Sequence, residues 1–151
     1  MRTELIGILA VMGLAWGCRH SPKDGESIDD VCQVSNDGKT VTVSGYVRQY
    51  GGTSFCTHDG CPFNIAPRAG KVPDGQQTLS AYFREGKGPR SVEVLKSSNP
   101  APEDLVLRDD GERTFHPVSV VRVTGKARVK ETDGGLVCHV IGLEHVELVE
   151  D

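Results

Sequence analysis

The side chains with the most evident chemical potential lie in one short segment that contains Cys56, His58 and Cys61. Two sulfurs and an imidazole are ligands that zinc and copper prefer, and a fourth ligand would complete a tetrahedral zinc site. The histidines that can supply the fourth ligand are His116, His139 and His145. Metal ligation requires thiolates, whereas an oxidising compartment favours a disulfide between the same two cysteines. The segment therefore predicts a Cys56–Cys61 disulfide, with a zinc or copper site as the alternative.

The number of cysteines favours the disulfide. The chain has five cysteines, an odd number. Cys18 directly follows the apolar N-terminal segment and is considered below, and the other four cysteines can all pair. Cys56 and Cys61 are close enough in sequence for a tight turn to join them. Cys32 and Cys138 lie at the two ends of the expected domain, and domain ends are often adjacent. We therefore expect Cys56–Cys61 and Cys32–Cys138 bridges, with a Cys56–Cys138 bridge as the alternative pairing.

The first 17 residues have the pattern of a secretory signal peptide. Arg2 precedes an apolar run over residues 5–16, which is too short for a membrane-spanning helix of about 20 residues. The end of this run, Ala15-Trp16-Gly17-Cys18, resembles the lipobox of bacterial lipoproteins. In that family the cysteine directly after the cleavage site carries lipid such as palmitate. The resemblance implies removal of residues 1–17, lipidation of Cys18, and anchoring to the extracytoplasmic side of a bacterial membrane.

Residues 19–26 are polar and lack periodicity, so residues 18–26 are expected to comprise the lipidated cysteine and a flexible tether. A single β domain is expected over residues 27–151. Ser27 and the two aspartates after Ile28 are typical of a helix N-terminus. The spacing of Ile28, Val31 and Val34 predicts that these three side chains share one face of a short helix.

Two later segments carry the same strand pattern. Residues 40–47 alternate β-branched with other side chains around Gly45, and residues 121–129 repeat the pattern around Gly125. A glycine inside a strand indicates a bulge or a barrel bend. Each segment leads through a Gly-Gly pair to a cysteine, so each predicts a hairpin. Further strands are expected at residues 78–83, 91–95, 105–107, 113–116 and 136–149, the first two of them around a glycine-rich turn.

This order of elements resembles the OB-fold domains of bacterial envelope proteins over residues 27–149. The resemblance implies a small barrel in which the first and fourth strands are bent at a glycine. We therefore expect a mainly β domain of about five to seven strands, an OB-like barrel with a short N-terminal helix. A β-sandwich is the alternative.

Composition and motifs limit the function. The 151 residues include 17 basic and 21 acidic side chains, and this net charge of −4 argues against nucleic acid as a partner. The basic loop that contains Arg84, Lys87 and Arg90 is interpreted as a solvated loop tip. No nucleophile-elbow, zinc-protease or P-loop motif occurs, so no enzyme is predicted. We expect a non-catalytic envelope lipoprotein that binds a protein or a saccharide without a cofactor, or alternatively zinc or copper through the Cys56–Cys61 segment.

Overall fold

The computed structural model describes residues 25–49, 56–96 and 99–149, and Cys18 lies outside this part of the chain. The chain begins with helix α1 (Ile28–Val31) and a 3-10 turn (Val34–Asn36). The strands are β1 (Thr40–Gln49), β2 (Cys61–Ala66), β3 (Leu79–Glu85), β4 (Ser91–Val94), β5 (Leu105–Arg108), β6 (Thr114–Phe115), β7 (Val120–Thr132) and β8 (Gly135–Leu148). These eight strands exceed the expected five to seven.

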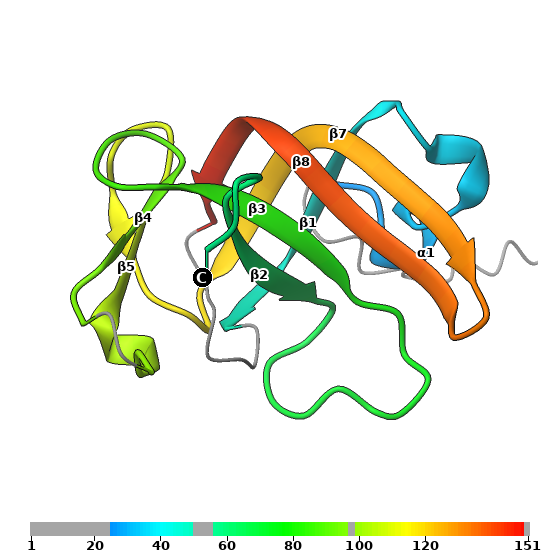
Figure 1. Ribbon diagram of the computed structural model, residues 1–151, viewed down its shortest axis with the longest axis horizontal. Helices are drawn as coiled ribbons and strands as arrows, with labels where there is room; N and C mark the ends of the chain where they lie inside the picture. The colour runs from blue at the N-terminus through cyan, green and yellow to red at the C-terminus, as the bar shows by residue number, and fades with distance from the viewer. Residues whose placement is uncertain (1–24, 50–55, 97–98, 150–151) are drawn as a thin grey trace, which may run out of the picture.

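Five of these strands close into a barrel (Figure 1). β1 pairs antiparallel with β2 and β7, β2 pairs with β3, and β7 pairs with β8. The parallel pairing of β3 with β8 closes the circle, with Ser80 opposite His139. In chain order the barrel strands are β1, β2, β3, β7 and β8. The OB-like barrel is therefore confirmed, and the β-sandwich is not formed.

The two strand glycines lie in the first and fourth barrel strands, as the resemblance implies. A Cβ atom on Gly45 in β1 would lie 2.6 Å from the carbonyl oxygen of Ala66. A Cβ atom on Gly125 in β7 would lie 2.9 Å from the carbonyl oxygen of Ile141, where the β7–β8 register shifts. Both distances are shorter than a normal carbon–oxygen contact, so each glycine allows two strands to approach closely.

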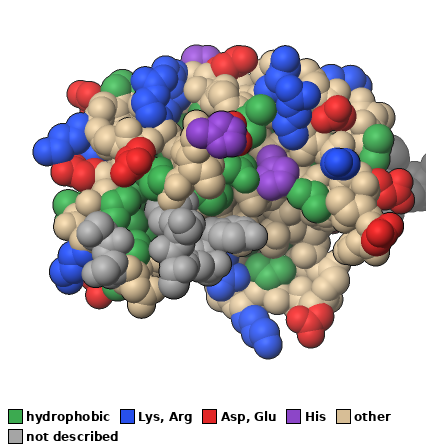
Figure 2. Space-filling view, viewed as in Figure 1, with side chains coloured by type: hydrophobic (Ala, Val, Ile, Leu, Met, Phe, Trp, Pro, Cys, Tyr) green, Lys and Arg blue, Asp and Glu red, His purple; other side chains and the backbone are tan. Residues whose placement is uncertain are grey.

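The core fills the inside of the barrel. Alternate residues of β1 and β7 point inward, and Val43 and Val123 are fully buried. Phe63 and Phe83 meet edge to face in the core with ring centroids 5.4 Å apart. Figure 2 shows that hydrophobic side chains form scattered patches on one face of the molecule. The alternation read from the sequence therefore decides which face of each strand is buried.

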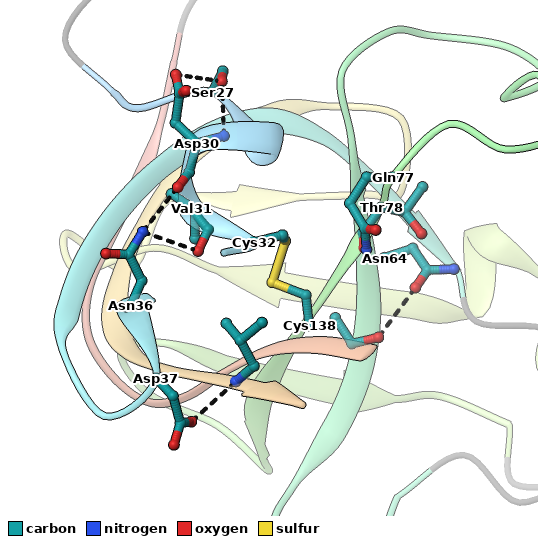
Figure 3. Close-up of a disulfide and its surroundings, with 12 residues drawn as sticks. Ser27, Asp30, Val31, Cys32, Asn36, Asp37, Asn64, Gln77, Thr78 and Cys138 are labelled. Carbon is teal, nitrogen blue, oxygen red and sulfur yellow. Dashed lines mark hydrogen bonds between the residues drawn. A yellow bond between two sulfur atoms is a disulfide. The ribbon is translucent and has the colours of Figure 1, made fainter. Parts of the chain in front are cut away.

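Helix α1 starts as predicted. The Ser27 hydroxyl oxygen accepts a hydrogen bond from the backbone N–H of Asp30 at 3.1 Å, and Ile28 and Val31 are buried. The prediction that Val34 shares this buried face is wrong, because Val34 is 54% exposed. The side-chain amide of Asn36 donates to the Asp30 and Val31 carbonyls, which ends the helix before Val34 (Figure 3).

A disulfide fastens this end of the chain to the barrel. Cys32 follows α1, and its bond to Cys138 in β8 joins residues whose Cα atoms are 5.5 Å apart (Figure 3). Both cysteines are buried in the same hydrophobic core. The bond therefore fixes α1 against β8.

Strands β4, β5 and β6 form an insertion beside the barrel between β3 and β7 (Figure 1). A turn at Asp109-Asp110-Gly111 joins β5 and β6, which pair antiparallel. The glycine-rich turn between β3 and β4 does not form a hairpin, because these two strands pair in parallel through two residues of each. Positive φ angles at Gly86, Gly88 and Arg90 coil the loop, so β4 leaves in the direction of β3.

Candidate ligand-binding site

The Cys56–Cys61 segment forms a closed loop directly before β2. A disulfide joins the two cysteines, whose Cα atoms are 4.0 Å apart. Between them, Thr57 and Gly60 exchange two backbone hydrogen bonds of 2.8 and 3.1 Å. The loop is therefore a tight turn held by a covalent bond and a pair of hydrogen bonds.

Gly60 seats this loop on β3. Its φ is 120°, and a Cβ atom at this position would lie 2.6 Å from the carbonyl oxygen of Phe83. His58 stands at the tip with its side chain 90% exposed, and its Nε2 lies 3.3 Å from the Asp59 carboxylate. A small residue with positive φ is therefore what lets the loop rest against the barrel.

The predicted metal ligands are only partly brought together. Within the described residues, the group of potential ligands closer than 4.8 Å consists of Cys56, Cys61 and Glu85, without His58. The sulfur atoms of Cys56 and Cys61 form a disulfide, so neither is a thiolate that could bind a metal ion. Of the other candidates, His116 Nδ1 lies 2.8 Å from the Leu105 carbonyl, the His139 ring is tilted against the Tyr82 ring, and His145 lies beside Asp110. This arrangement favours the disulfide interpretation of the segment.

An open pocket of about 430 Å³ lies beside the disulfide loop. Its walls are loop residues 57–60, the β3 residues Tyr82, Arg84 and Glu85, the loop residue Arg90, and the β8 residues Gly142 and Leu143. Four parts of the chain therefore meet at this pocket, and the disulfide fixes one of them.

Arg90 is held in place by the β5–β6 turn and by β8. Its guanidinium Nη1 lies 3.5 Å from the Asp110 carboxylate and donates to the Glu144 carbonyl. The interpretation of the basic loop as a solvated tip is wrong for Arg90, which is half-buried and bound to β8. Arg84 is exposed near the end of β3 and lines the open pocket. Lys87 fits that interpretation better, because it is exposed and pairs with an acidic neighbour on β4 at 3.2 Å.

Asp110 in turn is anchored to β8. Its backbone N–H donates to the Val146 carbonyl at 2.8 Å, and its carboxylate accepts from the Val146 N–H at 3.2 Å. The Nδ1 atom of His145 lies 2.9 Å from the same carboxylate. The insertion is thus docked on the barrel by the residue that orients Arg90.

The pocket combines an aromatic ring with charges of both signs. Arg84 and Arg90 are donors only, whereas the Asp59 and Glu85 carboxylates are acceptors. Tyr82 lies on the outward side of β3, between inward-facing Ala81 and Phe83. The sequence pattern draws attention to the two arginines and not to Tyr82, although the outward position of Tyr82 in the alternation of β3 can be read from the sequence.

Comparisons with protein-family models, with curated proteins and with solved structures found no match to this chain. Within the described residues, no helix has the length and apolar character needed to cross a membrane.

Proposed function

We propose that this chain is a bacterial envelope lipoprotein whose OB-like barrel binds a saccharide in the pocket beside the Cys56–Cys61 loop. The observation that carries the proposal is the pocket lining, in which the Tyr82 ring lies among two arginines and two carboxylates. The proposed role is binding without catalysis and without a cofactor.

The chemistry of a sugar matches this lining. A sugar ring presents C–H groups that pack on an aromatic face, and hydroxyl groups that both donate and accept hydrogen bonds. The pocket volume of about 430 Å³ falls within the small-ligand range of about 300–1,000 Å³. A protein partner would instead need about 800 Å² of complementary surface. The disulfide and the Arg90 contacts hold the walls before binding, which lowers the entropy lost when a ligand binds.

The location rests on the leader. Cleavage after Gly17 and lipidation of Cys18 would attach the domain to the outer side of a bacterial membrane. The two disulfides of the domain support this placement, because disulfides form and persist in oxidising compartments outside the cytoplasm. In this proposal the protein contacts the membrane only through the lipid on Cys18.

Titration of the purified protein with neutral oligosaccharides, followed by nuclear magnetic resonance, tests the pocket. Tyr82→Ala should weaken binding roughly tenfold, equivalent to about 1.4 kcal/mol. Tyr46→Ala is the matched control, because Tyr46 is also a half-buried tyrosine on a barrel strand. Thermal unfolding of both variants measures any loss of stability. Oligosaccharide binding that shifts no resonance of the pocket residues would refute the proposal.

Zinc or copper binding remains the second candidate, because Cys56, Cys61 and Glu85 place three ligand atoms within 4.8 Å of one another. A dithiol would first have to reduce the disulfide to two thiols, and binding would then release the thiol protons. Metal analysis of the protein purified without reductant separates the two candidates. A stoichiometric metal ion would favour this second function.

A further inference from the structure

The outer face of β7 carries an unbalanced row of cations. Three exposed basic residues occupy alternate positions: Lys126, Arg128 and Lys130. Directly opposite them on β8 are three residues that lack a carboxylate: Ile141, His139 and Val137. The same two strands place Glu147 opposite Arg122, and their side chains form an ion pair of 2.7 Å. Arg122 on β7 is therefore neutralised by an acidic residue on β8. The three cations that follow on the same face of β7 have no acidic residue opposite them on β8.

A second cavity lies beside this row. It has a volume of about 350 Å³, and its walls include Arg128, Lys130, Val137 and His139. Asp37 is the acidic residue of its lining, and one carboxylate oxygen of Asp37 accepts the backbone N–H of Val129 at 3.0 Å. The Asp37 carboxylate is thus hydrogen-bonded to the backbone of β7, and the cavity lining contains two basic side chains, Arg128 and Lys130, against this one carboxylate.

A pair of rings connects the two cavities. Tyr82 lines the saccharide pocket, His139 lines the second cavity, and their ring centroids are 5.5 Å apart. The Nδ1 atom of His139 is buried and has no hydrogen-bond partner in the structure. Burial lowers the pKa of His139, so the ring is neutral at pH 7 and its two nitrogens comprise one donor and one acceptor.

We propose that this face is an extended subsite for an acidic polysaccharide, with Lys126, Arg128 and Lys130 binding its carboxylates while Tyr82 and His139 contact its sugar rings. The inference rests on the proposed function and names its ligand class. The continuity of the row with the saccharide pocket favours a glycan chain that occupies both. The two rings are inclined at 52° to each other, so they do not form the parallel platform on which successive nucleic-acid bases stack.

Several weak contacts must act together on such an exposed face. Each single ion pair with solvent access contributes little, and salt screens it further. Binding of an acidic chain is therefore expected to depend on all three cations and to weaken as ionic strength rises. A neutral chain of the same length should be insensitive to both changes.

Fluorescence anisotropy with two probes of equal length tests this inference: an oligogalacturonate and a neutral glucose oligomer. Simultaneous Lys126→Gln, Arg128→Gln and Lys130→Gln should weaken oligogalacturonate binding at least tenfold and change neutral oligomer binding less than twofold. The matched control changes three exposed cations elsewhere to glutamine, namely Arg68, Lys71 and Lys87. This control removes the same charge and should leave both affinities within twofold of the unmodified protein.

The outcomes separate the two proposals. If both oligomers bind equally and the triple variant changes neither, the acidic-glycan inference is overturned and the saccharide pocket stands. If oligogalacturonate binding depends on the row but Tyr82→Ala leaves it unchanged, the saccharide pocket and the role of Tyr82 in the subsite are rejected, and only the binding of acidic groups by the three cations stands. Tighter binding to a DNA oligomer or to phosphatidylserine vesicles than to oligogalacturonate would also overturn the inference. Absence of binding by either oligomer rejects both proposals.

Discussion

Cys32 after α1 and Cys138 in β8 are 106 positions apart in the sequence, yet their Cα atoms lie 5.5 Å apart. A bond across so long a loop strongly restricts the unfolded chain, by about 5 kcal/mol on the chain-entropy model, against about 2 kcal/mol for the short Cys56–Cys61 loop. Cys32→Ala should therefore lower the melting temperature further than Cys56→Ala, by on the order of 10 °C. Calorimetry under non-reducing conditions measures the difference. Peptide mapping that finds a Cys56–Cys138 peptide would contradict both pairings.

The bends of the barrel should be intolerant of side chains. Gly45→Val and Gly125→Val each place a Cβ atom within 3.0 Å of a backbone carbonyl oxygen, so we expect each to destabilise by about 3 kcal/mol. Thr42→Val is the control, since it removes one hydroxyl hydrogen bond of 2.8 Å to Thr124 and should cost about 1 kcal/mol. Chemical denaturation measures all three. Equal losses would show that the barrel does not require close approach at the glycines.

Acid should weaken the fold through Asp109. Burial acts to raise the pKa of this carboxyl, but hydrogen bonds from Arg113 and the Leu148 N–H outweigh it and lower the pKa below its usual value. Asp109 therefore stabilises the fold above pH about 4, and this contribution is lost as the pH falls through the lowered pKa. Asp109→Asn should cost about 2 kcal/mol at pH 7 and flatten the loss of stability between pH 4 and pH 2. Asp133→Asn, at an exposed turn, is the control and should change the free energy of unfolding at pH 7 by less than about 0.5 kcal/mol.

The membrane anchor is tested at Cys18. Lipid on this residue would hold the protein in the membrane fraction, because two or more acyl chains give stable binding where one chain gives marginal binding. Cys18→Ser should move the protein into the soluble fraction without altering saccharide affinity. Intact mass before and after reduction reports cleavage, lipid and disulfides in one measurement. Recovery of unmodified protein starting at Cys18 would reject the anchor.

Local patterns in the sequence predict most of the barrel. Alternation over residues 40–47 and 121–129 identifies the inward faces of β1 and β7, and the two glycines mark the bends. Both patterns depend on neighbours within one strand, where side chains alternate with a fixed period. The prediction that Val34 lies on the buried helix face is wrong, because the Asn36 side chain caps the Asp30 and Val31 carbonyls and ends the helix. The spacing of apolar residues carries no information about such a side-chain contact.

The candidate sites could not be assembled from local patterns. Tyr82 and His139 meet only because β3 and β8 pair in parallel, and nothing within either strand specifies that partner. Arg90 lines the pocket because Asp110 in the insertion and the Glu144 carbonyl in β8 hold it, and both lie far from Arg90 in the sequence. A net charge of −4 likewise gives only the sum of the charges. It cannot show that three cations on β7 lack acidic neighbours, because those neighbours are known only from the pairing of β7 with β8.

The position of β8 in the barrel also sets the order of folding. This strand pairs with β7 on one side and β3 on the other, so both of those edges stay open until it is synthesised. Open edges recruit other strands and favour aggregation. Bringing Ser80 to His139 also requires a long chain segment to close, a step that slows folding. The barrel therefore closes only after β8 has been synthesised, and a nascent chain that ends before residue 135 leaves one edge of β7 and one edge of β3 unpaired.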